Sequence, residues 1–272
     1  MKKVQQNESN SPPLYWQTCG RGQDVVLVHG WGMNGAVWHN TVEALSQHYC
    51  VHVVDLPGFG HSHQASFERM DDLAEQVLKH APENAIWLGW SLGGLLATHI
   101  ALHHPLRVCK LVTVASSPKF AAQKPWRGIQ PQVLSAFTEQ LVDDFQLTIE
   151  RFMALQAMGS PSARKDVKQL KHAVLSRPAP NPTSLLAGLN LLAEIDYRHQ
   201  LVQLTMPMLR LYGRLDGLVP VKVASDVDTL TPDSESVVFA ASSHAPFMTE
   251  FESFCEQVKR FIDNSSPLCN KR

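Results

Sequence analysis

The sequence lacks any apolar run long enough to cross a membrane. A bilayer-spanning helix needs about 20 consecutive apolar residues, and polar residues interrupt every window of that length. The first residues, MKKVQQNESNSPP, contain two lysines but no apolar stretch after them, so they do not resemble an export signal. We therefore expect a cytoplasmic protein that is neither exported nor embedded in a membrane.

The sequence contains few cysteines, and its net charge is close to zero. The five cysteines stand far apart and none forms a C-x-x-C pair, which argues against a disulfide framework and against a zinc site. The thirteen histidines show no convincing metal-ligand spacing, so we expect no metal and no organic cofactor. A formal net charge of -1 gives no general attraction to nucleic acids or membranes, so electrostatic recognition would need a local patch.

The chain does contain a regular alternation of short β-branched runs with helix-period segments. The alternating strand-like and helix-like stretches are 24–30, 35–47, 50–56, 67–80, 85–90, 92–104 and 108–116. Such alternation is typical of a parallel sheet with helices on both faces. The sequence therefore predicts an α/β fold with a mostly parallel central sheet.

The alternation stops after Pro118 and resumes with the strand-like stretches MPMLRLYG and SVVFA. Between them, residues to about Asp196 have the pattern of successive helices separated by glycine and proline. Helices inserted into such a sheet predict a lid. The predicted divisions are a disordered tail at 1–12, a core at 13–117 and 197–263, a helical lid at 118–196 and a flexible tail at 264–272.

The stretch GWSLGG, residues 89–94, supplies a candidate nucleophile. Gly89, Ser91 and Gly93 fit the pattern G-x-S-x-G, and they lie between a strand-like run and a helical segment. A serine at so sharp a turn has a strained backbone, which costs about 1–3 kcal/mol, and the neighbouring glycines relieve the crowding. A junction that only packs tightly or holds a phosphate is the alternative, but the lysine and glycine spacing of phosphate loops are absent.

A serine nucleophile needs a base that takes its proton and an acid that orients the base. In enzymes with this turn the three follow in the order serine, acid, histidine. His244, in the loop ASSHAPF, is the only histidine beyond residue 199. Asp216, in GRLDGLVP, is the candidate acid and Asp196 is the reserve. An Asp-Gly pair alone is ordinary turn chemistry, but the later histidine favours Asp216 as the acid.

Acyl transfer also needs N–H donors for the oxygen that becomes negative in the transition state. The stretch VHGWG, residues 28–32, predicts a glycine-loosened turn directly after a strand. There the backbone N–H of Trp31 can act together with that of Leu92 as an oxyanion hole. We expect His29, in the same turn, to make structural hydrogen bonds rather than to act as the base.

Positive charge gathers within the predicted lid. Residues 164–177 contain five basic residues against one acidic residue, in a chain of net charge -1. On a helix over this stretch, Arg164, Lys168 and Lys171 share one face while apolar residues share the neighbouring face. Arg151 would extend this basic patch. A solvated helix face and a docking surface for an acidic partner are both consistent with the pattern.

Six stretches together resemble the α/β-hydrolase superfamily, and they are LVHGWGMN, VVDLPGFGHS, IWLGWSLGGL, LVTVASSP, LYGRLDGLVP and HAPF. The resemblance extends from about Leu14 to Ile262. Trp31 in the HGWG turn, Trp90 in the serine turn and the lid stretch DDFQLTIERFMALQAMG carry a narrower similarity. They resemble the BioH family of pimeloyl-[acyl-carrier protein] methyl ester carboxylesterases.

The resemblance implies hydrolysis of the methyl ester of pimeloyl-[acyl-carrier protein] in biotin synthesis, with release of methanol and the free acid. It implies a catalytic triad of Ser91, Asp216 and His244, with Trp31 and Leu92 as oxyanion donors. The substrate-binding residues that it implies are Trp31, Ser91, Leu92, Phe152, Met153, Ala154, Leu155, Gln156 and His244.

The resemblance also favours carrier docking on Arg151, Arg164, Lys168 and Lys171. Leu147 departs from the family, because a basic residue is expected at this lid position, and it leaves one charge contact to the carrier unsupported. Other functions share the same framework. They include short-acyl esterases, carbon-carbon bond hydrolases and ligand receptors that perform no chemistry. A complete triad weighs against a receptor, and we expect a monomer.

Overall fold

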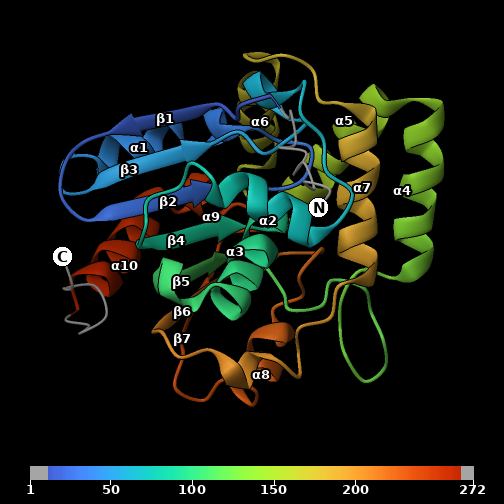
Figure 1. Ribbon diagram of the computed structural model, residues 1–272. Coiled ribbons are helices and arrows are strands. Elements are labelled where there is room, and N and C mark those ends of the chain that lie inside the picture. The colour runs from blue at the N-terminus through green and yellow to red at the C-terminus, as the bar shows by residue number, and fades with distance from the viewer. Residues whose placement is uncertain (1–11, 265–272) are drawn as a thin grey trace, which may run out of the picture.

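The computed structural model describes residues 12–264, and within them seven strands form one sheet (Figure 1). The strands are β1 (Trp16–Cys19), β2 (Asp24–Val28), β3 (Cys50–Val54), β4 (Ala85–Trp90), β5 (Val108–Val114), β6 (Met208–Gly213) and β7 (Glu235–Phe239). Their order across the sheet is β1-β3-β2-β4-β5-β6-β7. β1 pairs antiparallel with β3, and every other neighbouring pair is parallel. The predicted mostly parallel sheet is confirmed.

The central strands are β4 and β5, and both are buried along their whole length. Their sequences, AIWLGW and VCKLVTV, are almost continuously apolar, as expected for parallel strands that helices cover on both faces. Lys110 is the charged exception, and its ammonium donates to the carbonyl oxygens of Phe261 and Ile262 at 2.9 and 2.8 Å. The buried charge therefore binds the end of the last helix.

Helices cover both faces of this sheet (Figure 1). α3 packs on β4 and β5, with α2 beside it, while α1 and α10 contact each other on the opposite face. The helices outside the β5–β6 connection are α1 (His39–Leu45), α2 (Met70–Leu78), α3 (Leu92–His103), α8 (Lys222–Asp228), α9 (Pro246–Thr249) and α10 (Phe251–Asp263). Short 3-10 turns are η1 (Gly35–Trp38), η2 (Gly60–Ser62), η3 (Pro105–Arg107) and η4 (Leu201–Gln203).

Four further helices stand between β5 and β6, where the sequence predicts a lid. They are α4 (Pro131–Asp143), α5 (Phe145–Ala157), α6 (Ala163–Leu175) and α7 (Pro182–Glu194). α5 contacts both α4 and α6, and α4 contacts α7, so the four form one group beside the sheet (Figure 1). The bounds 118–196 and a lid function stay predictions. The predicted tails lie outside the described residues, apart from Pro12 and Asn264.

Hydrogen bonds fasten this helical group to the loops that follow β2 and β3. Arg177, after α6, forms a 2.5 Å ion pair with the fully buried Asp55, whose other oxygen accepts from the backbone of His61. The indole N–H of Trp31 donates to the carbonyl oxygen of Leu185 in α7 at 2.7 Å. These loops leave the carboxyl ends of parallel strands, so the helical group is held over that edge of the sheet. Among residues 12–264, no helix is long and apolar enough to cross a membrane.

Candidate active site

Ser91 occupies the sharp turn between β4 and α3. Its φ of 55° and ψ of -118° lie in a region that residues with side chains rarely adopt. A Cβ on Gly89 would lie 2.1 Å from the carbonyl oxygen of Gly93, and a Cβ on Gly93 would lie 2.4 Å from that of Val28. Only glycine fits at either position, so the sequence pattern has a direct steric cause.

The strained serine is held by bonds on both sides of its peptide. Its backbone N–H donates to the carbonyl oxygen of Val114 at 2.9 Å, and its carbonyl oxygen accepts from the hydroxyl of Ser116 at 2.8 Å. α3 begins at Leu92, so the N–H of Leu92 belongs to a helix end whose first amides have no partner within the helix. Such an end favours negative charge, as an oxyanion hole requires.

His244 and Asp216 form a buried pair. Nδ1 of His244 lies 2.7 Å from Oδ2 of Asp216, and because a carboxylate only accepts, Nδ1 carries the proton. The other oxygen, Oδ1, accepts from the backbone N–H groups of Leu218 and Val219 at 2.8 and 3.0 Å. The carboxylate is therefore fixed in position, and it fixes the imidazole with Nε2 as the nitrogen free to accept a proton.

The loop of His244 is bound by two further elements. The indole N–H of Trp90, next to the serine, donates to the carbonyl oxygen of His244 at 2.7 Å. The backbone N–H of His244 donates to the carbonyl oxygen of Gln156 in α5 at 3.0 Å. Within the described part of the chain, Nε2 of His244 is buried and has no hydrogen-bond partner. A buried polar atom without a hydrogen-bond partner calls for an explanation. One explanation is that this nitrogen is kept free to accept a proton during catalysis.

The turn after β2 carries the second predicted oxyanion donor. Trp31 is fully buried, and Gly32 next to it has a φ of 71° that favours glycine. The Trp31 ring meets the Phe152 ring of α5 edge to face, with centroids 4.7 Å apart. The donor roles of the Trp31 and Leu92 amides stay predictions, but the Trp31 side chain contacts two of the inserted helices, through the Phe152 ring of α5 and the carbonyl oxygen of Leu185 in α7.

His29 makes the structural hydrogen bonds expected of it. Its Nε2 accepts from the backbone N–H of Leu56 at 3.0 Å, so Nδ1 carries the proton and donates to the carbonyl oxygen of Gly30 at 2.8 Å. Complete burial lowers its pKa from 6.5 to about 4, and the nearby Asp55 carboxylate only partly opposes that effect. His29 is therefore neutral and joins the loops after β2 and β3.

The five predicted pocket residues of α5 do not share one environment. Phe152, Met153 and Gln156 are buried, Leu155 is half-buried and Ala154 is exposed. Ala154 is therefore exposed to solvent, unlike Phe152, Met153 and Gln156. In the described structure, Oε1 of Gln156 is buried without a hydrogen-bond partner. No sequence pattern indicates this unpartnered amide oxygen or the bond from His244 to the backbone of α5.

The reserve acid, Asp196, has other partners. Its carboxylate binds the guanidinium of Arg198 at 2.7 Å and the ammonium of Lys119 at 3.2 Å. The hydrogen bonds from Arg198 lower its pKa, and Lys119 lowers it further. Asp216, not Asp196, is the acid that contacts His244.

The predicted basic residues lie on the exposed side of the inserted helices. Arg151, Arg164, Lys168 and Lys171 are exposed, whereas Leu170 and Val174 on the neighbouring face of α6 are buried. Lys171 forms a 2.6 Å ion pair with Glu150 of α5. The patch is thus smaller than the sequence suggests, since Lys171 is already paired.

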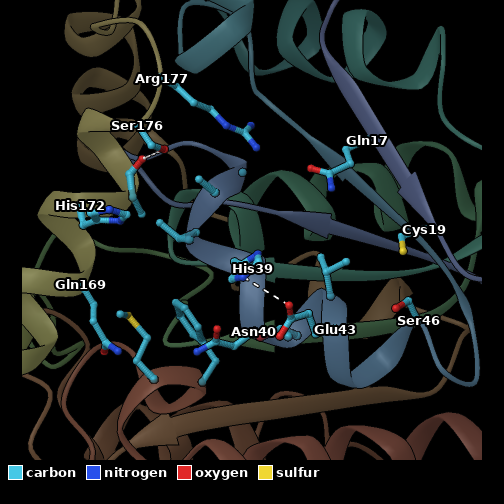
Figure 2. A pocket seen from close by; sticks show the side chains of 18 of the residues that line it. Gln17, Cys19, His39, Asn40, Glu43, Ser46, Gln169, His172, Ser176 and Arg177 are labelled. Atoms are coloured by element: carbon cyan, nitrogen blue, oxygen red, sulfur yellow. Dashed lines mark hydrogen bonds and ion pairs between the residues drawn. The ribbon is translucent and has the colours of Figure 1, made fainter.

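A groove of about 870 Å³ lies between α6 and the η1–α1 segment (Figure 2). His172 and Arg177 lie on one side, and His39 and Glu43 lie on the other. Lys168 of α6 is also among the lining residues. Neither Ser91 nor His244 is among its lining residues. The groove therefore borders the basic patch and is separate from the serine turn.

Comparison with known proteins identifies the family. The model of the alpha/beta hydrolase fold matches residues 25–251. A pimeloyl-[acyl-carrier protein] methyl ester esterase from Vibrio parahaemolyticus is 69% identical over 93% of this chain and the relative's whole length. A protein of the same name from Vibrio cholerae is 70% identical over 91% of this chain and 97% of the relative. The chain belongs to the family of pimeloyl-[acyl-carrier protein] methyl ester esterases. This esterase is a carboxylic ester hydrolase.

Solved structures support the fold of this esterase. An esterase from Exiguobacterium antarcticum superposes with a TM-score of 0.82 at 24% identity, covering 92% of this chain and 96% of that one. A bromoperoxidase from Bacillus anthracis gives a TM-score of 0.80 at 21% identity, covering 92% and 95%. The predicted α/β-hydrolase fold and the predicted family are both confirmed.

The buried neutral His29 predicts a pH-dependent stability of this esterase. The unfolded chain takes up a proton near pH 6.5 and the folded chain only near pH 4. The contribution of His29 to the free energy of unfolding should therefore be constant above about pH 7 and decrease as pH falls from about 6.5 to about 4. The contribution of His29 should reach about 3 kcal/mol. Urea unfolding of wild type at a series of pH values measures the decrease.

The matched variant for this test is His29→Asn. Its unfolding free energy should depend less steeply on pH than that of wild type, whatever it loses at neutral pH. Part of the slope should remain, because burial also lowers the pKa of His99 to about 4. An unchanged slope in His29→Asn would contradict the assignment.

Proposed function

We propose that this esterase hydrolyses the methyl ester of pimeloyl-[acyl-carrier protein] in biotin synthesis, releasing methanol and pimeloyl-[acyl-carrier protein]. Relatives that carry this name and match over 91–93% of the chain support the substrate. The 2.7 Å contact between His244 and Asp216, with the orphan Nε2 of His244, supports the chemistry most directly.

In the first step, Ser91 Oγ attacks the carbonyl carbon of the methyl ester while Nε2 of His244 takes its proton. The imidazolium that forms is stabilised by Asp216, which cannot move because two backbone amides hold it. The carbonyl oxygen becomes negative and is bound by the N–H groups of Trp31 and Leu92. The carbon–oxygen bond to methoxide then breaks, and the proton on Nε2 passes to the leaving oxygen as methanol.

In the second step, water replaces methanol. Nε2 of His244 takes a proton from the water as its oxygen attacks the acyl carbon bound to Ser91. The bond to Ser91 Oγ breaks, and the proton on Nε2 returns to the serine. The balance is one ester and one water converted to one acid and one methanol, with no redox change, so the steps require no cofactor.

Removing the nucleophile or the base should abolish hydrolysis. In units of this kind, loss of either group lowers turnover about a millionfold. Ser91→Ala and His244→Ala should each eliminate turnover of a short p-nitrophenyl ester while leaving the circular dichroism spectrum unchanged. Ser135→Ala, on α4, is the control and should retain wild-type turnover. Substantial turnover by folded Ser91→Ala would contradict the assignment of Ser91 as the nucleophile.

Phe152 is proposed to contact the acyl chain. It lies between Trp31 of the predicted oxyanion turn and Phe137 of α4, with ring centroids 4.7 and 5.8 Å away. Phe152 is buried, and its ring contact with Trp31 places it beside the turn that carries the predicted oxyanion donor. Aromatic rings supply a large apolar surface for such a chain.

Phe152→Ala should raise KM for a seven-carbon acyl ester more than for an acetyl ester, since only the longer chain reaches the lost surface. Steady-state kinetics on the two esters measure the difference. Leu141→Ala, a buried change on α4, is the packing control and should affect both esters alike. Equal effects of Phe152→Ala on both esters would assign Phe152 to packing.

The basic patch is proposed to dock the acidic carrier protein. Arg164 and Lys168 are exposed on α6 and form no ion pair within the described residues, whereas Lys171 is paired with Glu150. Leu170 and Val174 pack inward, so the patch is carried on a fixed helix face. Such a patch raises the association rate with an acidic partner, and salt screens its effect.

Arg164→Glu with Lys168→Glu should lower kcat/KM for the carrier-linked ester, most at low ionic strength, and leave a small p-nitrophenyl ester nearly unaffected. Lys79→Glu with Lys222→Glu changes the net charge equally at exposed sites elsewhere and is the control. If kcat/KM falls equally for both substrates, the patch has a structural role. If the carrier-linked ester is unaffected, the carrier docks elsewhere.

Three other functions are compatible with the same framework. A short-acyl esterase or a carbon-carbon bond hydrolase would use the same triad, and a receptor would use none of it. Comparing methyl esters of shorter and longer acyl chains with the carrier-linked pimeloyl ester separates the first two from the proposal. Our proposal also takes the protein to be a monomer.

A further inference from the structure

Three side chains with metal-ligand chemistry meet at the amino-terminal edge of the sheet. Asp24 and Cys50 are the first residues of β2 and β3, and they are register partners in the parallel pair. Residues paired in this way point to the same face, and His52, two residues along β3, shares it. One ligand atom from each of the three lies within 4.8 Å of the others.

The imidazole of His52 is oriented by a neighbour on each side. Its Nε2 lies 2.8 Å from Oδ1 of Asp24, and its Nδ1 lies 3.0 Å from the hydroxyl of Thr18. Thr18 is the partner of His52 across the antiparallel pair of β1 and β3. Because a carboxylate only accepts, Nε2 donates to Asp24, and Nδ1 of the neutral ring accepts from the Thr18 hydroxyl. When a cation takes the place of the Nε2 proton, Nδ1 carries the proton and donates to Thr18, which is how metal-binding histidines are commonly oriented.

We propose that Asp24, Cys50 and His52 form a binding site for a soft divalent cation, with zinc as the best match. Tetrahedral zinc holds thiolate, imidazole and carboxylate ligands with its donor atoms about 3.3–3.6 Å apart. In the observed cluster the ligand atoms lie within 4.8 Å of one another, close to that spacing. Thiolate with imidazole selects zinc over magnesium or calcium, which prefer oxygen ligands. Three protein ligands leave a fourth position for water.

Binding of the cation requires the loss of protons. The thiol of Cys50 must release its proton to become a thiolate ligand, and any proton on Nε2 of His52 must leave as well. One proton goes to solvent when the His52 ring starts neutral, because its Nε2 proton is replaced by one on Nδ1, and two go to solvent when the ring starts as imidazolium. No electron is transferred. Affinity should decrease as pH falls. The side chains of His52 and Asp24 are 15% and 29% exposed, so an ion can enter from solvent.

The site lies at the opposite edge of the sheet from Ser91. Cys50 and Asp24 begin their strands, whereas Ser91 directly follows the end of β4. A five-residue strand spans about 16 Å, so a bound ion does not reach the reacting atoms. The cation would instead cross-link the first residues of β2 and β3. Zinc should therefore raise the melting temperature and leave esterase turnover unchanged.

The test uses the full chain and metal ions alone. Zinc affinity is measured by competition with a chromophoric chelator, and cobalt(II) is added separately to detect the charge-transfer absorption of a thiolate ligand. Wild type should bind one zinc ion at this site and show the thiolate band. Cys50→Ser should lose the band and bind zinc about 100-fold more weakly or worse, and Thr18→Val about 10-fold more weakly.

Cys19→Ser is the matched control, because Cys19 is an exposed cysteine on β1 outside the cluster. It should retain both the affinity and the cobalt band. His52→Asn provides a second ligand variant if Cys50→Ser does not fold. Equal zinc affinity in wild type and the ligand variants, or no thiolate band in wild type, would overturn the proposal. Zinc that binds equally to every variant resides at other histidines.

Discussion

The strained backbone of Ser91 is the constraint on which the rest of the site depends. A φ of 55° at a residue with a side chain persists only where its surroundings enforce it. Here the enforcement is steric and local, because Gly89 and Gly93 approach neighbouring backbone more closely than a Cβ allows. The same turn ends β4, begins α3 at Leu92 and aims Trp90 at the loop of His244. One turn thus positions the proposed nucleophile, one predicted oxyanion donor and the tryptophan that supports the loop of His244.

The inserted helices form hydrogen bonds with both the Trp31 turn and the loop of His244. Leu185 of α7 accepts from the indole of Trp31, and Gln156 of α5 accepts from the backbone of His244. A shift of the helical group would therefore disturb the oxyanion turn and the base together. The Arg177–Asp55 ion pair opposes such a shift, because separating its members would leave the buried Asp55 charge without its cation. These contacts therefore link the inserted helices to the Trp31 turn and to the loop of His244.

Local patterns predicted much of the fold and the site, and long-range contacts account for the remainder. Apolar runs located six strands, and the order of motifs selected Asp216 and His244. β1 was not predicted, because its residues WQTC are half-buried or exposed and give no apolar signal. The pairing of Lys171 with Glu150 joins two helices, and the Asp24, Cys50 and His52 cluster joins two strands. Neither has a sequence spacing that could reveal it.

The central claim is that Ser91 is a nucleophile activated by His244. A fluorophosphonate probe tests it most directly, because the probe forms a covalent bond only with an activated serine. Native protein should gain one adduct, which peptide mass spectrometry should locate on Ser91, and His244→Ala should remain unlabelled. Absence of labelling in the native protein, or an adduct on another serine, would contradict the account.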